Sequence, residues 1–134
     1  MIYLDTSVAL AHLLSEDVRP PRRLWSEPIV SSRLLEYELM NRLHSRGLES
    51  SHGSAARSLL ATVSLLELAP PVLARALEPF PIPVRTLDAL HLASLDFLRR
   101  AGQRVHLATY DQRMLEAARA LGFPLADLGA PPGH

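Results

Sequence analysis

Residues 1–10 read MIYLDTSVAL, and this opening stretch decides the fold class. Ile2, Tyr3 and Leu4 are typical of a short buried strand, whereas the apolar residues after position 7 recur at helical spacing. Asp5 stands at the junction of the two patterns. It can serve as the N-cap of the following helix, or as a ligand at the carboxyl end of a strand, where open α/β sheets place their sites. Both roles stay open on these ten residues alone.

The alternation of short apolar runs and helical patterns continues along the chain. It predicts five strands, near residues 2–4, 28–32, 65–69, 105–109 and 123–127. Strands that alternate with helices in this way form a parallel sheet covered on both faces. The sequence therefore predicts an α/β fold in a single domain over residues 1–128. Residues 129–134, GAPPGH, are expected to be a flexible C-terminal tail.

The clearest helical pattern covers residues 85–102, RTLDALHLASLDFLRRAG. Its expected inner stripe consists of Leu87, Leu90, Ser94, Phe97 and Leu98. A second helix is predicted over residues 33–46, with Gly47 as its stop. Residues 49–54, ESSHGS, are expected to break the chain before another helix over residues 54–63.

Composition narrows the class of protein. The chain has 134 residues, of which 48% are hydrophobic and 21% charged, as in a globular domain. The absence of cysteine excludes disulfides, a thiol nucleophile and cysteine-based zinc sites. A net charge of zero argues against a general nucleic-acid binder. All fourteen basic residues are Arg, the better phosphate partner, although genomic base composition explains this bias more simply.

Targeting signals are also missing from the sequence. Nothing at the N-terminus resembles a signal peptide, because Asp5 arrives too early. No apolar run is long enough to span a bilayer. We therefore expect a cytoplasmic protein with no membrane partner.

Three aspartates occupy equivalent places at strand-to-helix junctions. Asp5 follows the first strand, Asp88 lies in the first turn of the helix after PFPIPV, and Asp111 follows the strand at residues 105–109. All such junctions of a parallel sheet share one edge, so we expect the three carboxylates to converge. Each of them taken singly has a structural explanation, because Asp is favoured at helix caps and first turns.

Glu38 is a fourth candidate. On a helical wheel it falls between Leu34 and Leu35, inside the apolar arc, where a charge is costly unless it is paired or bound. The alternative is a surface pair with Arg42, four residues on. His91 lies one turn from Asp88, so it can approach the pocket, although a packing residue of its helix is the simpler explanation.

Clustered carboxylates without a lysine repel one another, and a hard divalent cation relieves that repulsion. Mg²⁺ prefers oxygen ligands and typically uses one or two carboxylates directly. The remaining carboxylates can hold water or a second ion. Such a site suits phosphodiester hydrolysis.

Four segments, MIYLDTS, SSRLLEYELMNRL, RTLDALHLAS and ATYDQRMLEAARALGFPL, together resemble the PIN-domain family and, within it, the VapC-type toxin ribonucleases. The resemblance covers essentially the whole chain. It is most specific where TLDALHLA is followed about twenty residues later by TYDQRM. Residues 45–80 match only in pattern.

The resemblance implies a three-layer α/β/α fold with a five-stranded parallel sheet in the order 3-2-1-4-5. It implies an acidic catalytic pocket of Asp5, Glu38, Asp88 and Asp111, with Asp5 and Asp88 as the direct metal ligands. Thr6 and Thr109 match hydroxyl residues often found beside such pockets. The implied activity is Mg²⁺- or Mn²⁺-dependent cleavage of RNA by a homodimer that a small VapB-like antitoxin inhibits.

Two other functions are compatible with part of this pattern. A phosphoaspartyl protein also places an aspartate after its first strand, but it uses a lysine, and this chain has none. A PIN-like fold retained as a catalytically inert binding module is the second alternative. It would be favoured by a broken acidic set, and here the set is intact.

Overall fold

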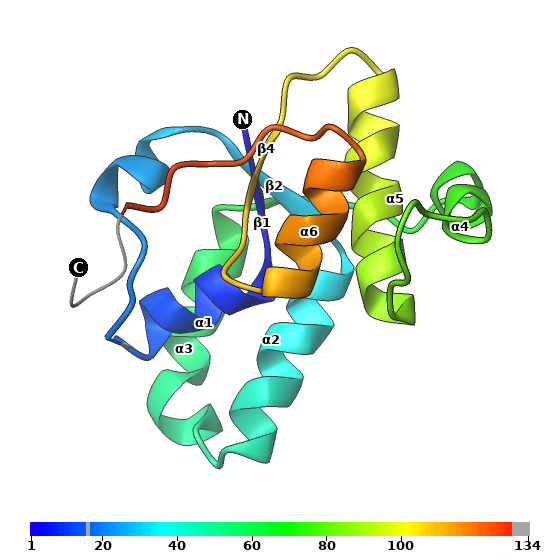
Figure 1. Cartoon of the computed structure of the whole chain (residues 1–134). Coiled ribbons are helices and arrows are strands. Elements are labelled where there is room, and N and C mark those ends of the chain that lie inside the picture. Colours follow the sequence, from blue (N-terminus) through cyan, green and yellow to red (C-terminus); the bar gives the residue numbers. More distant parts are fainter. Residues whose placement is uncertain (16, 130–134) are drawn as a thin grey trace.

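The structure, a computed structural model, describes residues 1–15 and 17–129 (Figure 1). Strands and helices alternate along the chain as predicted. The strands are β1 (Ile2–Leu4), β2 (Ile29–Ser32), β3 (Ser64–Leu66) and β4 (His106–Ala108). The helices are α1 (Thr6–Leu13), the 3₁₀ helix η1 (Arg22–Ser26), α2 (Leu34–Ser45), α3 (Glu49–Ala61), α4 (Pro70–Ala76), α5 (Thr86–Arg100) and α6 (Gln112–Ala120).

The four strands form one parallel sheet in the order β3-β2-β1-β4. In the register of the two central strands, Ile2 lies opposite Ile29 and Tyr3 opposite Val30. The predicted parallel pairing and the order of the first four strands are confirmed. Because all strands run the same way, the carboxyl ends of β1 and β4 open onto the same edge of the sheet.

The prediction of five strands is wrong for the described residues. The segment expected to form the fifth strand runs beside β4, but it makes only a single parallel bridge, between Leu107 and Leu125. Leu107 N–H donates to the carbonyl of Pro124, and Ala126 N–H donates to the carbonyl of Leu107. Pro124 has no N–H of its own to extend the ladder. Residues 130–134 of the expected tail lie outside the described residues.

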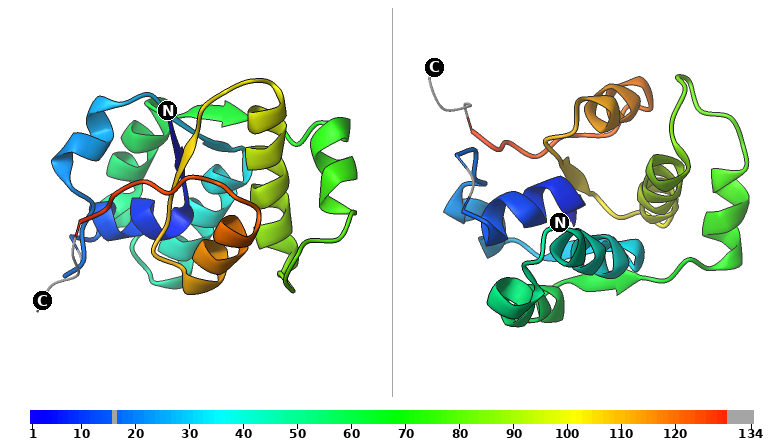
Figure 2. Two further views of the ribbon diagram at one scale, coloured as in Figure 1. Left: turned by 45° about the horizontal axis from the view of Figure 1, so that its top comes forward. Right: turned by 90° about the horizontal axis from the view of Figure 1, so that it is seen from below.

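Helices cover both faces of the sheet, as the three-layer prediction requires (Figure 2). Alternate residues of β1 point to opposite faces. Leu4 packs into a core with Leu35, Leu39 and other residues of α1, α2 and α3. Tyr3 packs into a second core, whose members include Leu92 of α5 and the apolar face of α6. Burial on both faces explains why β1, at the centre of the sheet, has no polar residue other than Tyr3.

The prediction for residues 49–54 is corrected by packing. The expected break at residues 49–54 is helical, because α3 begins at Glu49 and runs through a buried Gly53. Glycine inside a helix costs about 1 kcal/mol, so tertiary contacts outweigh local preference there.

Within the described residues, no helix has both the length and the apolar character needed to cross a bilayer.

The inner stripe predicted for α5 is also incorrect in part. Leu87 is 48% exposed, whereas Leu92 and Leu95 are fully buried in the core. Ser94 is buried as expected. The helix packs against the sheet on one side and against α4 on another (Figure 1), so its buried surface is broader than a single stripe.

Candidate active site

The four predicted acids come together at the carboxyl edge of the sheet. Asp5 follows β1, Glu38 projects from α2, Asp88 lies in the first turn of α5 and Asp111 precedes α6. All four line one pocket of about 680 Å³. Two of the strand-to-helix junctions, after β1 and after β4, belong to adjacent strands, which explains the convergence.

Asp5 combines the two roles that its sequence position left open. It is the N-cap of α1, where its Oδ2 accepts a hydrogen bond from the Ser7 N–H. The same oxygen accepts hydrogen bonds from the hydroxyls of Ser7 at 2.6 Å and Thr109 at 2.8 Å. The side chain is only 8% exposed, yet it lines the pocket. Capping through Oδ2 therefore does not exclude a ligand role for Oδ1.

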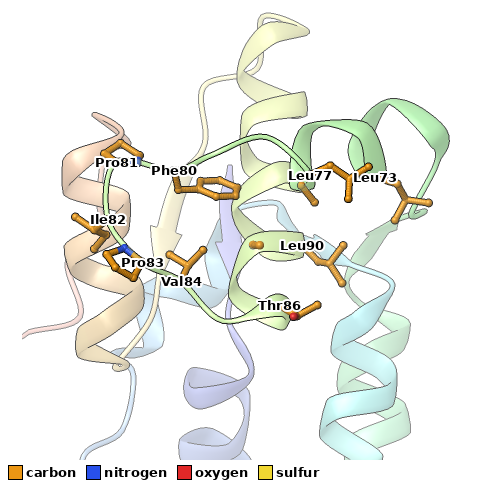
Figure 3. Close-up of a pocket in the computed structure, with 11 residues that line it drawn as sticks. Leu73, Leu77, Phe80, Pro81, Ile82, Pro83, Val84, Thr86 and Leu90 are labelled. Carbon is orange, nitrogen blue, oxygen red and sulfur yellow. The ribbon is translucent and has the colours of Figure 1, made fainter.

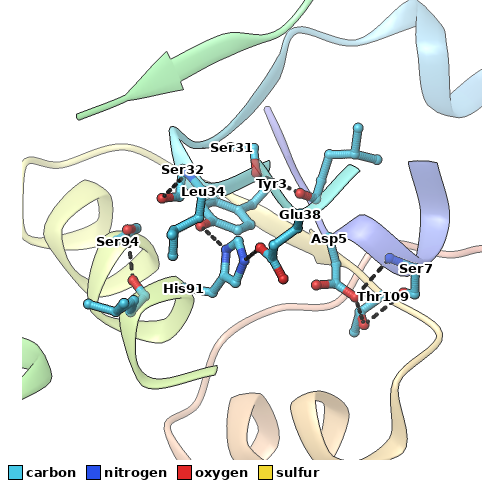
Figure 4. A network of polar contacts seen from close by, with 12 residues as sticks. Tyr3, Asp5, Ser7, Ser31, Ser32, Leu34, Glu38, His91, Ser94 and Thr109 are labelled. Carbon is cyan, nitrogen blue, oxygen red and sulfur yellow. Dashed lines mark hydrogen bonds and ion pairs between the residues drawn. The ribbon is translucent and has the colours of Figure 1, made fainter. Parts of the chain in front are cut away.

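Hydroxyl groups tie the two junctions together (Figure 4). Ser7 Oγ accepts a hydrogen bond from the Tyr110 N–H, and Thr109 Oγ1 accepts one from the Asp111 N–H. Asp111 in turn caps α6 by accepting from the Arg113 N–H. These bonds fix the end of β1 against the end of β4 and hold Asp5 and Asp111 at the same pocket.

Asp88 lies in a repulsive environment. Partial burial raises the pKa of its carboxyl, and the charges of Asp111 and Asp5 raise that pKa further. A backbone hydrogen bond at Arg85 and the proximity of His91 act in the opposite direction without cancelling the shift. A raised pKa among like charges is typical of functional sites.

Glu38 does not pair with Arg42, the surface alternative. Its Oε1 lies 2.5 Å from Nε2 of His91, and Nδ1 of His91 lies 2.8 Å from the hydroxyl of Tyr3 (Figure 4). His91 is 1% exposed, so the expectation of a packed residue is correct. The alternative, that His91 approaches the pocket, is correct as well, because His91 lines it. The signal available was its spacing of three residues from Asp88, which places both on one helix face.

The donor set of the pocket fits a hard divalent cation. Carboxylate oxygens are the ligands that Mg²⁺ prefers, and one or two of them suffice when water completes the shell. The Oγ1 of Thr6, which also lines the pocket, is buried and has no hydrogen-bond partner among the described residues. No three His, Asp or Glu side chains in the described part of the chain are grouped closely enough to enclose an ion by themselves. The residue types that line the pocket therefore fit a hydrated divalent ion.

Cationic and apolar surfaces adjoin the acidic pocket. Arg42, Arg85 and Arg113 line it and are exposed. A separate apolar groove of about 700 Å³ lies between α4, the segment 80–84 and the start of α5 (Figure 3). Thr86 lines both cavities, so the groove meets the pocket at the first turn of α5.

Fold and pocket together define a parallel α/β protein whose acidic site, at the carboxyl edge of the sheet, suits a divalent cation and a phosphate ester. The sequence profile of the PIN domain matches residues 2–120. The chain therefore belongs to the PIN-domain family, which confirms the resemblance inferred from its motifs.

Relatives within the family carry the name ribonuclease VapC. The chain is 35% identical to ribonuclease VapC47 of Mycobacterium tuberculosis, over 97% of this chain and 98% of that protein. It is 38% identical to ribonuclease VapC46 of the same organism, over 91% of this chain and 93% of that protein.

Solved structures share the fold. The crystal structure of M. tuberculosis VapC20, described as a sarcin-ricin loop cleaving toxin, matches with a TM-score of 0.66 and 20% identity, over 94% of this chain and 98% of that one. A toxin–antitoxin complex from Klebsiella pneumoniae matches with a TM-score of 0.62 and 18% identity, over 90% and 94% of the two chains.

Proposed function

We propose that this protein is a Mg²⁺- or Mn²⁺-dependent endoribonuclease and the toxin of a VapBC-type toxin–antitoxin pair. The observation that carries the proposal is the convergence of Asp5, Glu38, Asp88 and Asp111 on one pocket. The relatives named ribonuclease VapC, which match over nearly the whole chain, support the reaction class.

Asp5 and Asp88 are the residues that would hold the cation. Asp5 is fixed by three hydrogen bonds to Oδ2, which leave its other oxygen for a ligand. A bound cation would stabilise ionised Asp88, because burial and then the charges of Asp111 and Asp5 disfavour that form. The bound ion would supply Lewis-acid stabilisation of the phosphate and a more acidic water.

Glu38 and Asp111 are the supporting acids. Glu38 is held by His91 on one wall, and Asp111 lies at the mouth of the pocket as the cap of α6. Both can accept hydrogen bonds from water in the pocket, and so orient it toward a phosphate.

We propose that three arginines at the rim of the pocket bind the phosphates of the RNA backbone. Arg42, Arg85 and Arg113 come from three different elements around the acids. Guanidinium groups bind phosphate oxygens in a bidentate manner, and such contacts position nucleic acid without reading its sequence.

The proposed toxin role also implies protein partners. A VapB-like antitoxin is proposed as the inhibitor, with support from the solved toxin–antitoxin complex that shares this fold. A homodimer and a cytoplasmic location, where RNA and antitoxin are both present, complete the proposal. Size-exclusion chromatography with light scattering, on the chain alone and with the antitoxin encoded beside it, tests both assemblies.

The activity itself is tested by Mn²⁺ calorimetry followed by RNA cleavage. Wild type should bind Mn²⁺ saturably and cleave RNA, and EDTA should abolish cleavage. Asp5→Asn and Asp88→Asn should abolish both properties while circular dichroism shows a retained fold. A folded wild type that binds no Mn²⁺ and cleaves no RNA would favour the inert binding module instead.

A further inference from the structure

His91 is a buried polar group to which the nuclease mechanism above gives no role of its own. Its side chain is 2% exposed, yet both ring nitrogens have hydrogen-bond partners. Nδ1 meets the Tyr3 hydroxyl and Nε2 meets Glu38 Oε1 (Figure 4). The three residues lie on α5, β1 and α2, so these contacts connect three elements at the wall of the pocket.

The direction of the contact with Glu38 is fixed by chemistry. An ionised carboxylate only accepts hydrogen bonds, so the Nε2–H of His91 donates to Glu38 in either charge state of the ring. The Tyr3 hydroxyl is fully buried and stays protonated, so it can donate to Nδ1 of the neutral ring and accept from the Nδ1–H of the charged ring. The two rings also meet edge to face, with their centroids 5.8 Å apart. Tyr3 thereby fixes the rotation of the imidazole.

Glu38 depends on this support for its geometry. Its side chain is 19% exposed, and α2 presents it to a pocket that already contains three aspartates. A glutamate has three rotatable bonds, and repulsion from like charges would otherwise turn it outward. The bond from His91 engages Oε1, and the other oxygen is directed away from the imidazole (Figure 4).

We propose that His91 is a positioning residue of the active site, holding the Glu38 carboxylate toward the divalent cation and the RNA phosphate, with Tyr3 holding the imidazole in turn. The inference rests on the proposed nuclease function and deepens it. Hydrogen-bonding groups behind the ligands orient metal sites, and their removal costs roughly 10- to 100-fold in metal affinity or activity.

Three variants separate positioning from packing. His91→Phe keeps a ring in the core but removes both nitrogens. His91→Gln keeps an N–H donor close to the position of Nε2. Tyr3→Phe removes only the hydroxyl that supports the ring. Mn²⁺ affinity of the whole chain, measured by calorimetry, should fall about tenfold in H91F and less in Y3F, whereas H91Q should recover most of it.

A double-mutant cycle with Glu38→Gln tests whether His91 acts through Glu38. In that background H91F should cause no further loss of Mn²⁺ affinity, because the positioned carboxylate is already gone. An RNA cleavage assay should show a lower kcat with an unchanged KM in H91F, since the rim arginines are intact. A merely structural role would lower thermal stability without moving the metal affinity.

The outcomes are distinguishable. Wild-type Mn²⁺ affinity in folded H91F, or an undiminished effect of H91F in the E38Q background, would overturn the positioning role alone. If wild type binds no Mn²⁺, the nuclease proposal fails instead. If H91F does not fold, Y3F decides the question, and an unchanged affinity in Y3F overturns the inference.

Discussion

Helix α5 carries two aspartates, Asp88 and Asp96, in opposite electrostatic environments. Asp88 in the first turn shares a pocket with Asp5 and Asp111. Asp96, two turns further along, is 4% exposed and forms ion pairs with three arginines: Arg75, Arg99 and Arg100.

The two carboxyls are shifted in opposite directions. Burial by itself raises the pKa of Asp96, but the hydrogen bonds and charges of Arg99, Arg100 and Arg75 outweigh burial and lower it. Burial also raises the pKa of Asp88, and there the neighbouring charges add to the shift. One helix therefore contains a carboxylate whose charge is neutralised by arginines and another that shares a pocket with like charges.

The arginines around Asp96 also show how the end of α4 is fixed. Arg75 bonds Asp96 and lies over the ring of Phe80, while Arg99 lies over the ring of Phe123. The contacts of Arg75 attach α4 and the start of the following segment to α5, whereas the contact of Arg99 attaches the segment after α6. We conclude that Asp96 has a structural role, and Asp88 has the properties of a functional residue.

The largest contrast is expected in cleavage. Asp88→Asn should lower RNA cleavage by about 1,000-fold, equivalent to about 4 kcal/mol, because a metal ligand is lost. Asp96→Asn should leave residual activity in proportion to the folded fraction. Single-turnover cleavage at fixed Mn²⁺ concentration measures both, and equal losses in the two variants would contradict the division of roles.

The effects of substitution on stability should be in the reverse order, larger at Asp96 than at Asp88. Asp96→Ala leaves a partly buried Arg75 without its partner, so we expect a loss of about 2–3 kcal/mol in the free energy of unfolding. Asp88→Ala should cost much less. Urea denaturation followed by circular dichroism gives both values, and a smaller loss in D96A than in D88A would refute the comparison.

The pH dependence of stability should differ in sign between the two sites. Because its pKa is raised in the folded state, protonated Asp88 contributes to folding stability below about pH 4. This contribution to stability is lost as the pH rises. Metal-free D88N should therefore gain thermal stability over wild type as the pH rises from 3 to 7.

Asp96 has a lowered folded-state pKa, so its contribution is present above about pH 4 and lost as the pH falls. D96N should lose stability relative to wild type over the same rise in pH. Melting temperatures measured from pH 3 to 7 check both slopes, and parallel slopes for the two variants would exclude the assigned environments.

The smallest effect is expected at an exposed pair of the same chemistry. Oδ2 of Asp127 lies 3.2 Å from Nη2 of Arg23, and the two side chains are 82% and 61% exposed. Asp127→Ala should change the free energy of unfolding by about 0–1 kcal/mol, because solvent screens exposed pairs. Urea denaturation beside D96A provides the comparison, and a loss as large as that of D96A would mean that burial is not what distinguishes the pairs.

The acidic site could be largely predicted from the sequence because its geometry follows from the sheet. Asp5 and Asp111 each follow a strand closely, and parallel strands bring such positions to one edge. Glu38 was found through a different signal, its place inside an apolar arc. The roles of these residues as ligands remain predictions.

Features that depend on packing between distant segments could not be read in the same way. The spacing of Glu38 suggested Arg42, four residues on, but its partner is His91, which is 53 residues away. The stripe of α5 was predicted for one buried face, and packing against both the sheet and α4 buried Leu92 and Leu95 instead.

The sequence by itself determined the alternating α/β fold, the parallel sheet and the edge at which the acids gather, because strand and helix periodicities and chain direction are local properties. Only the tertiary structure decided which carboxylates are buried and which groups of other elements face them. Arg99 and Arg100 lie on the same helix as Asp96, one turn further along, so these two partners follow from spacing. The burial of Asp96, its pair with Arg75 of α4, and the approach of Asp5 and Asp111 to Asp88 depend on other elements. Coulombic energies depend on separation in space and on burial, and for residues on different elements neither follows from position along the chain.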